Sequence, residues 1–146
     1  STLDEPTARD DAAIKQFLRE FNQSANPQLW AKLDDPQHAP RSLFVAAHRE
    51  GAEIIGGLLA TTSMSWLKID IMAVRREYRG QGLGEQLLAA AEAEALRRRC
   101  KYSLLDTMDY QAPEFYRQNG YEVAGRIDDW DSHGHMKYIF TKRLRP

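Results

Sequence analysis

Glycines occupy alternate positions in an arginine-rich segment near the middle of the chain: Gly80, Gly82 and Gly84. The segment lies between an apolar run that ends at Val74 and a helix-forming run that begins at Glu85. Glycine lets backbone N–H groups approach an anion closely, and the start of a helix adds partial positive charge. Full positive charges come from three arginines of the same segment: Arg75, Arg76 and Arg79. Together these residue types predict a site for a phosphate or a diphosphate.

Two well-known phosphate motifs do not match this segment. The P-loop requires a glycine at the sixth position from Gly80, where Glu85 stands. The dinucleotide fingerprint G-x-G-x-x-G also fails at Glu85, although Asp106 follows at about the expected 20-residue spacing. A solvated turn without a ligand is the alternative interpretation. Three alternate glycines lower the stability of the helix that they open, so a turn with no function would gain nothing from them. The pattern that remains, [Q/R]-x-x-G-x-[G/A], is met by Arg79, Gly82 and Gly84.

A second motif, A-x-x-F/L-Y-x-x-x-G-Y/F, follows further along the chain and is met by Ala112, Phe115, Tyr116, Gly120 and Tyr121. Both motifs, in this order and with a strand between them, resemble those of the Gcn5-related N-acetyltransferase (GNAT) superfamily. The resemblance covers about residues 43–144. The segment LDTMDYQAPEFYRQNGYEV is also similar to a bacterial subgroup of small GNAT proteins.

The resemblance implies an enzyme that moves an acetyl group from acetyl-coenzyme A to a primary amine of a small molecule, by direct attack in a ternary complex. It implies that the coenzyme diphosphate binds the backbone N–H groups of Arg79, Gly80, Gln81, Gly82, Leu83 and Gly84. The pantetheine arm would pair with the backbone of Met72, Ala73 and Val74. The thioester would lie in a slot between the strand that ends at Val74 and the strand over Tyr102 to Asp106.

Two residues are the candidates for proton transfer, which the attack of an amine on a thioester requires. Tyr116 occupies the position of the thiol-protonating tyrosine of the family, although a packing role on an amphipathic helix is the alternative. Asp70 is the candidate base, because strand alternation predicts that it shares a face with Lys68, Met72 and Val74. The family's usual acidic position falls near Lys68, which is a departure.

The identity of the base stays open at this point. Asp70 could instead be a buried hydrogen-bonding residue, since a carboxylate inside an apolar strand is costly without a partner. Asp106 and Asp109 at the end of the next strand are rivals, and a relay of water molecules would need no single base. Asp109 stands where many family members carry asparagine, so the usual coenzyme contact of that residue is in doubt.

Acidic and aromatic residues gather in the polar loop over residues 128–135. Carboxylates beside an aromatic ring suit a cationic amine through Coulomb attraction and cation–π contact. We therefore expect the acceptor to bind Asp106, Trp130 and Asp131, with a solvated surface loop as the alternative. His133 and His135 lack a fixed third ligand, so no metal is expected.

The elements that must position these residues can be recognised from hydrophobic periodicity and turn signals. Helices are expected over Asp10–Phe21, near Leu29–Leu33, and over Glu85–Arg99 and Pro113–Asn119. Strands are expected over Leu43–Arg49, Ala52–Met64, Leu67–Val74, Tyr102–Asp106, Tyr121–Ile127 and Met136–Leu144. Gly56 and Gly57 predict a bulge in the second strand.

This order predicts an α+β fold in a single domain over residues 1–146. Its sheet is expected to be mixed, mostly antiparallel and flanked by helices. The resemblance implies six to seven strands in that sheet and a splay between its two central parallel strands.

Composition narrows the class of partner. The net charge is -1, so no positive field points to nucleic acid, and this disfavours a toxin that acetylates charged tRNA. The apolar runs are too short for a membrane span, and the single cysteine favours a cytoplasmic location. A homodimer is common in the family and is neither supported nor excluded. A protein or peptide N-acetyltransferase and a non-catalytic acyl-coenzyme A binding module remain the alternatives.

Overall fold

The computed structural model describes residues 5–51 and 53–145. The chain forms two compact units, Ser1–Ala39 and Pro40–Pro146, and each is described by itself. The single domain expected over residues 1–146 stays a prediction. Within the described residues, no helix combines the length and the apolar character that crossing a membrane requires.

The first unit contains α1 (Ala8–Ala25), α2 (Pro27–Leu33) and a short 3-10 helix, η1 (Pro36–His38). The Thr7 hydroxyl caps α1 by accepting a hydrogen bond from the Asp10 N–H at 3.1 Å. Asn26 separates the helices, and its side chain accepts from the Leu29 N–H at 3.1 Å. Both expected helices are therefore confirmed, and each is longer than expected.

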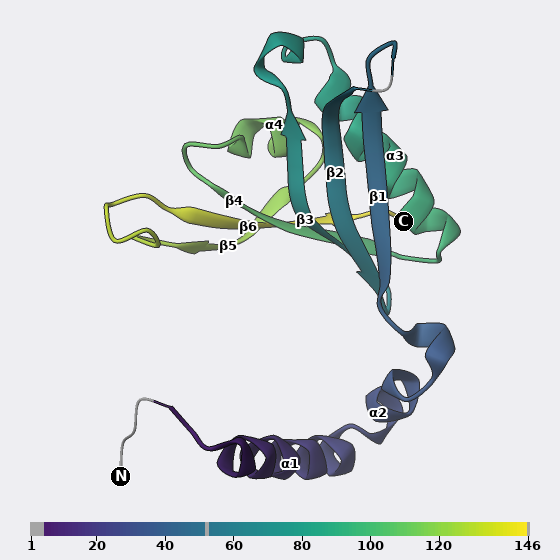
Figure 1. Cartoon of the computed structure of the whole chain (residues 1–146), viewed down its shortest axis with the longest axis vertical. Coiled ribbons are helices and arrows are strands. Elements are labelled where there is room, and N and C mark those ends of the chain that lie inside the picture. Colours follow the sequence, from purple (N-terminus) through teal and green to yellow (C-terminus); the bar gives the residue numbers. More distant parts are fainter. Residues whose placement is uncertain (1–4, 52, 146) are drawn as a thin grey trace. The chain divides into compact units, whose positions relative to one another are not determined.

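The second unit is built on one six-stranded sheet with the order β1-β2-β3-β4-β6-β5 (Figure 1). Its strands are β1 (Arg41–His48), β2 (Ile54–Ser63), β3 (Trp66–Val74), β4 (Tyr102–Met108), β5 (Glu122–Ile127) and β6 (Lys137–Arg143). Its helices are η2 (Arg76–Tyr78), α3 (Leu83–Arg97) and α4 (Pro113–Gln118). The expected α+β class is confirmed.

The two central strands of the sheet, β3 and β4, share the shortest pairing. β3 and β4 run parallel and pair over only three residues each, Trp66 to Lys68 with Tyr102 to Leu104. All other neighbouring strands are antiparallel and pair over longer stretches. Beyond Lys68 the two central strands diverge, as Figure 1 shows. The expected splay is therefore confirmed.

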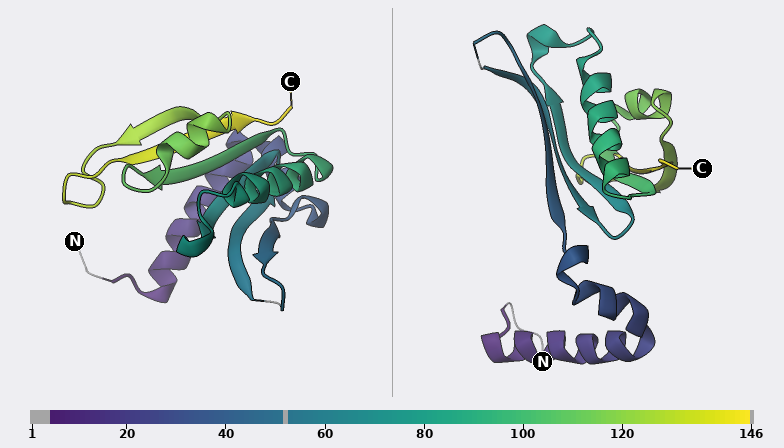
Figure 2. Two further views of the ribbon diagram at one scale, coloured as in Figure 1. Left: turned by 90° about the horizontal axis from the view of Figure 1, so that it is seen from above. Right: turned by 90° about the vertical axis from the view of Figure 1, so that its right-hand side faces the viewer.

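α3 covers one face of the strands β1 to β3 (Figure 2). Its apolar residues recur with helical spacing, so one side of the helix is buried against the sheet: Leu87, Leu88, Ala91 and Ala95. They join a core with Leu58, Leu67 and Phe140, each of which is fully buried. This packing fixes the start of α3, and with it the glycine segment, relative to the end of β3.

The expected bulge lies beside Gly56 and Gly57: the β1–β2 register shifts between Ala47 and His48, which leaves Ile55 as an extra residue next to Gly56. A second shift, in the β2–β3 register, lies between Leu59 and Ala60. The glycines serve close approach, because an added Cβ would lie 3.2 Å from the Ala73 carbonyl oxygen at Gly56 and 3.2 Å from that of Val45 at Gly57. Because the register passes from Ile71 to Ile69, Asp70 is the extra residue.

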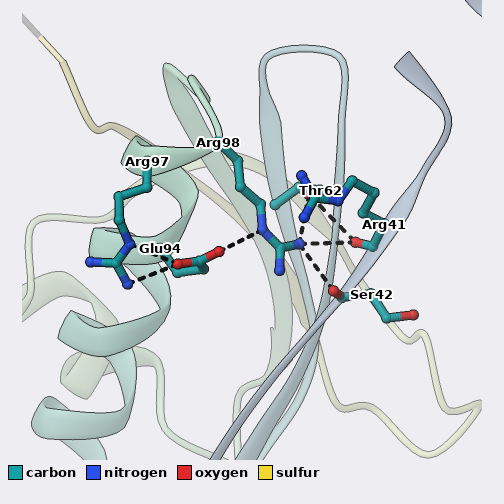
Figure 3. A network of polar contacts seen from close by, with 6 residues as sticks. All are labelled: Arg41, Ser42, Thr62, Glu94, Arg97 and Arg98. Atoms are coloured by element: carbon teal, nitrogen blue, oxygen red, sulfur yellow. Dashed lines mark hydrogen bonds and ion pairs between the residues drawn. The ribbon is translucent and has the colours of Figure 1, made fainter. Parts of the chain in front are cut away.

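Arg98 joins the end of α3 to β1 and β2 (Figure 3). Its guanidinium donates to the Ser42 carbonyl oxygen at 3.0 Å and to the Thr62 hydroxyl at 3.1 Å. It also pairs with Glu94 at 2.9 Å, and its side chain is only 15% exposed. Hydrogen bonds from a charged donor in a half-buried setting contribute more than exposed ones.

We expect Arg98→Ala to lower the free energy of unfolding by about 2 kcal/mol, because it leaves the Thr62 and Ser42 acceptors without this donor. Arg97→Ala is the matched control, since Arg97 pairs with the same Glu94 but is 70% exposed. We expect the control to change the unfolding free energy by less than about 0.5 kcal/mol. Urea unfolding measures both, and equal losses would show that Arg98 acts only through Glu94.

Candidate active site

A cleft of about 620 Å³ lies where β3 and β4 diverge. One wall is the carboxyl-terminal half of β3 with Arg79, Gly80 and Gly84. The other wall is the end of β4, together with residues of the β4–α4 connection and of α4 between Tyr110 and Tyr116. The two sequence motifs therefore meet at one cavity, whose volume is in the range of small-molecule sites.

The glycine segment curls at the end of β3. Gly80 and Gly82 have φ values of 74° and 80°, a left-handed conformation that favours glycine, and an added Cβ would meet no atom within 4 Å at either position. Gly82 caps α3, whose first N–H groups have no partner within the helix. The Arg79 side chain donates to the Val74 carbonyl oxygen at 2.9 Å and thereby ties the loop to β3. The Arg79 N–H donates to the Arg76 carbonyl oxygen at 3.3 Å, so the open cradle of backbone donors begins at Gly80.

The three arginines of the segment do not contribute equally to the field of the cradle. Arg75 forms ion pairs with Glu53 and Glu77. The hydrogen bond to Glu53 is the main cause that raises the pKa of Arg75. Its charge is therefore largely neutralised, and the Arg79 side chain is engaged with the backbone. An anion site here, which stays a prediction, would therefore depend more on backbone N–H groups than on Arg75 and Arg79.

The bulge at Asp70 changes which side chains share a face of β3. Leu67 and Ile69 are buried, and after the bulge Met72 packs against the same core. Val74 also lies on that face, 3.4 Å from a Cβ built at Gly56, to which Leu87 of α3 is equally close. The expectation that Lys68, Asp70, Met72 and Val74 share one face is therefore wrong, because one extra residue inverts the alternation.

Asp70 lines the cleft, and its side chain is 45% exposed. The interpretation of a buried hydrogen-bonding carboxylate is therefore wrong. Its carboxylate lies 3.9 Å from the Lys68 ammonium, a loose ion pair at the surface of the sheet. The bulge also removes Asp70 from the β2–β3 ladder. A carboxylate thus stands at the cleft wall, where it can accept a proton.

Tyr116 lines the cleft from α4 and is only 7% exposed. Its ring packs edge-on against Phe115 and Tyr121, with centroid distances of 5.2 and 5.8 Å. Burial raises the pKa of Tyr116, because the apolar surroundings disfavour the phenolate. Among the side-chain hydrogen bonds of residues 5–51 and 53–145, none involves the Tyr116 hydroxyl. The hydroxyl is therefore protonated at neutral pH and available as a donor.

A polar network behind Tyr116 was not predicted. The Tyr121 hydroxyl hydrogen-bonds the Ser103 hydroxyl at 2.7 Å and donates to Glu92 at 3.1 Å. The Lys142 ammonium donates to the same carboxylate at 2.9 Å. Burial is the main cause that raises the pKa of Tyr121. Glu92 follows the buried Ala91 on α3, and its side chain is only 15% exposed. The sequence signal that could have indicated this network is an acidic residue next to the apolar stripe of the helix.

The three expected acceptor contacts separate in the structure. Asp106 lines the cleft and lies 3.6 Å from the Lys137 ammonium. Trp130 does not belong to the residues that line this cleft, and the centre of its ring lies 4.0 Å from the Lys137 ammonium. Asp131 is also outside that lining, and it accepts hydrogen bonds from the His133 and His135 N–H groups. A substrate-binding role for these residues stays a prediction.

Asp109 serves the loop that precedes β6. It accepts from the Met136 N–H at 3.0 Å and hydrogen-bonds the His135 ring at 2.9 Å. The Met136 N–H is the main cause that lowers the pKa of Asp109, and His135 adds to it. Its neighbour Tyr110 lines the cleft, which the sequence did not indicate. Asp109 therefore holds the loop before β6 through both carboxylate oxygens, which makes it a less suitable base than Asp70.

Comparison with known proteins agrees with this geometry. A family model described as "Acetyltransferase (GNAT) domain" matches residues 39–123. The chain is 36% identical to the blasticidin-S acetyltransferase of Streptomyces morookaense over 131 residues, which cover 87% of this chain and 96% of that protein.

Solved structures show the same fold. An acetyltransferase from Bacillus cereus superposes with a TM-score of 0.79 at 29% identity, covering 98% of this chain and 97% of that chain. A streptothricin acetyltransferase from Bacillus anthracis, solved with acetyl coenzyme A, superposes with a TM-score of 0.64 at 20% identity, covering 72% of this chain and 64% of that chain.

Proposed function

Since this chain belongs to the GNAT family of acetyltransferases, we propose that it transfers the acetyl group of acetyl-coenzyme A to a primary amine of a small molecule. The observation that carries the proposal is the cleft between the splayed strands β3 and β4, into which both motifs contribute residues. The acetyl-coenzyme A bound to the Bacillus anthracis protein of the same fold supports the choice of acetyl donor.

The cradle of the glycine segment fits the coenzyme diphosphate. Gly80 and Gly82 have positive φ and no atom within 4 Å of a Cβ built on them, and the N–H groups of Leu83 and Gly84 lie in the first turn of α3. Met72, Ala73 and Val74 form the edge of β3 that lines the cleft, where backbone groups can pair with the pantetheine amides. Acetyl-coenzyme A supplies the activated acetyl group as a thioester.

The proposed proton transfers use the two walls of the cleft. The amine nitrogen forms a bond with the acetyl carbon while the carbon–sulfur bond breaks. Asp70 accepts the proton that the amine loses, directly or through a water molecule. Tyr116 donates a proton to the leaving thiolate, which its raised pKa allows across the neutral range.

The charge of the cleft supports a cationic acceptor. Asp70 and Asp106 both line it, and their lysine partners lie 3.9 and 3.6 Å away, longer than a direct hydrogen bond. Carboxylates in a partly enclosed site attract ammonium groups. The name of the relative from Streptomyces morookaense makes blasticidin S the first acceptor to test. A cleft of this size suits a small molecule better than a folded protein.

The test is release of free coenzyme A thiol from acetyl-coenzyme A in the presence of single acceptors. The acceptors are cationic antibiotics, beginning with blasticidin S, each tested alone. We expect at least one of them to gain one acetyl group, which mass spectrometry detects. Turnover restricted to peptide N-termini would favour the peptide acetyltransferase alternative. Binding of acetyl-coenzyme A without turnover of any amine would favour the non-catalytic module, and either result would overturn the proposal.

Asp70→Asn should lower kcat by about 100-fold, because the amide cannot accept the proton of the amine. The KM for acetyl-coenzyme A should stay within about twofold, since this side chain does not belong to the cradle. Asp106→Asn is the matched control, because it removes a second carboxylate of the same cleft. Steady-state kinetics with the identified acceptor decides, and a larger kcat loss in Asp106→Asn would transfer the base role to β4.

A further inference from the structure

Acidic residues of the loop over residues 128–135 accept hydrogen bonds from backbone N–H groups of the same loop. Asp131 accepts from the His135 N–H at 3.0 Å, and the Trp130 N–H donates to the His135 carbonyl oxygen at 2.9 Å. Asp129 accepts from the Gly134 N–H at 2.7 Å. The backbone of His135 is thus fixed on both sides.

The side chain of His135 is fixed as well. Its Nδ1 lies 2.9 Å from a carboxylate oxygen of Asp109, whose other oxygen accepts from the Met136 N–H. Asp109 is half-buried, whereas the histidine side chain is 48% exposed. An exposed side chain loses rotamer freedom when it is held in this way. The hydrogen bond to Asp109 therefore fixes the orientation of the His135 ring.

His135 packs against Tyr110, which lines the cleft. The two rings meet edge-to-face, with centroids 5.0 Å apart and an interplanar angle of 80°. Tyr110 is itself 62% exposed, so few other contacts restrict its ring. A chain of contacts therefore runs from Asp109 through His135 and Tyr110 to the cleft.

We propose that His135 is a positioning residue that, held by Asp109, keeps the Tyr110 ring in place as the aromatic wall for a cationic acceptor. The inference rests on the proposed function, since it assigns part of the same cleft. The coenzyme residues proposed above lie on β3 and at the start of α3. Tyr110 lies on the opposite wall, close in sequence to Asp106. Both residues line the same cleft, and a cleft that offers an aromatic ring and a carboxylate suits an ammonium group.

Steady-state kinetics of His135→Ala tests the role. We expect the KM for the cationic acceptor to rise by about tenfold, the scale of one lost cation–π contact, while kcat and the KM for acetyl-coenzyme A stay within about twofold. His135→Phe should restore part of the acceptor KM, because it keeps a ring against Tyr110 without the bond to Asp109. His133→Ala is the matched control, since the His133 ring contacts only the Asp131 backbone oxygen among the described polar contacts.

A second measurement does not need turnover. In protein labelled with fluorotyrosine, the Tyr110 signal is assigned by Tyr110→Phe and followed by fluorine NMR. It should move in His135→Ala and stay in place in His133→Ala. An unmoved signal, an unchanged acceptor KM, or an equal rise in the KM for acetyl-coenzyme A would overturn the role of His135. Absence of acetyl transfer by the unaltered protein would instead overturn the proposed function.

Discussion

Gly82→Val should weaken the binding of acetyl-coenzyme A by about 100-fold, as measured by calorimetry. A β-branched residue rarely adopts the φ of 80° that Gly82 has, so the turn must rearrange. The N–H groups that open α3 would then no longer converge on the diphosphate. Loss of two hydrogen bonds to a charged group costs about 3 kcal/mol, which corresponds to roughly a 100-fold change in affinity.

Gly51→Val is the matched control for backbone strain. Gly51 lies between β1 and β2 with a φ of 97°, and a Cβ there would also meet no atom within 4 Å. The two substitutions should lower stability by a similar amount, about 1–2 kcal/mol for a left-handed residue. Only Gly82→Val should affect the coenzyme. Equal affinities in the two variants would contradict a diphosphate cradle between β3 and α3.

Tyr116→Phe should lower kcat by about 100-fold, with a small effect on both KM values, because the thiolate then leaves without a proton donor. The substitution keeps the ring and its contacts with Phe115 and Tyr121. Because burial raises the pKa of Tyr116 above its ordinary value of 10.0, the donor form persists throughout the neutral range. The kcat of the unaltered enzyme should therefore show no loss from tyrosine ionisation below about pH 10.

Tyr121→Phe separates the chemical role from a packing role. Tyr121 lies against Tyr116, but its hydroxyl bonds Ser103 and Glu92 and is outside the described lining of the cleft. We expect this variant to lose about 1 kcal/mol of stability and to keep kcat within about twofold. A similar fall of kcat in both variants would mean that Tyr116 acts through packing. Stopped-time assays of thiol release at several pH values make the comparison.

The local elements of the second unit could be predicted because their signals are local. The stripe over Leu87, Leu88, Ala91 and Ala95 has helical spacing, and the buried positions of α3 match it. The left-handed turns at Gly80 and Gly82 need glycine whatever surrounds them. The acetyltransferase family could be recognised for the same reason, since its motifs are short and contiguous.

The loop before β6 shows what residue types leave undecided. Its acidic residues and Trp130 suggested an acceptor site, because carboxylates and an aromatic ring attract ammonium groups. In the structure Asp131 and Asp129 accept hydrogen bonds from N–H groups of their own loop, and Trp130 lies beside Lys137. Composition states which groups are present, but only the local backbone decides whether a carboxylate is already engaged.

The sequence by itself determined the helices, the strands and the glycine cradle, because each depends on neighbours within a few residues. The tertiary structure alone decided which face of β3 carries Asp70, because a bulge is a property of two paired strands and inverts the alternation beyond it. It also alone brought Asp109, His135 and Tyr110 together, since side chains from two distant segments meet there. Local energies therefore encode the elements, and pairing between distant segments encodes the shape of the cleft.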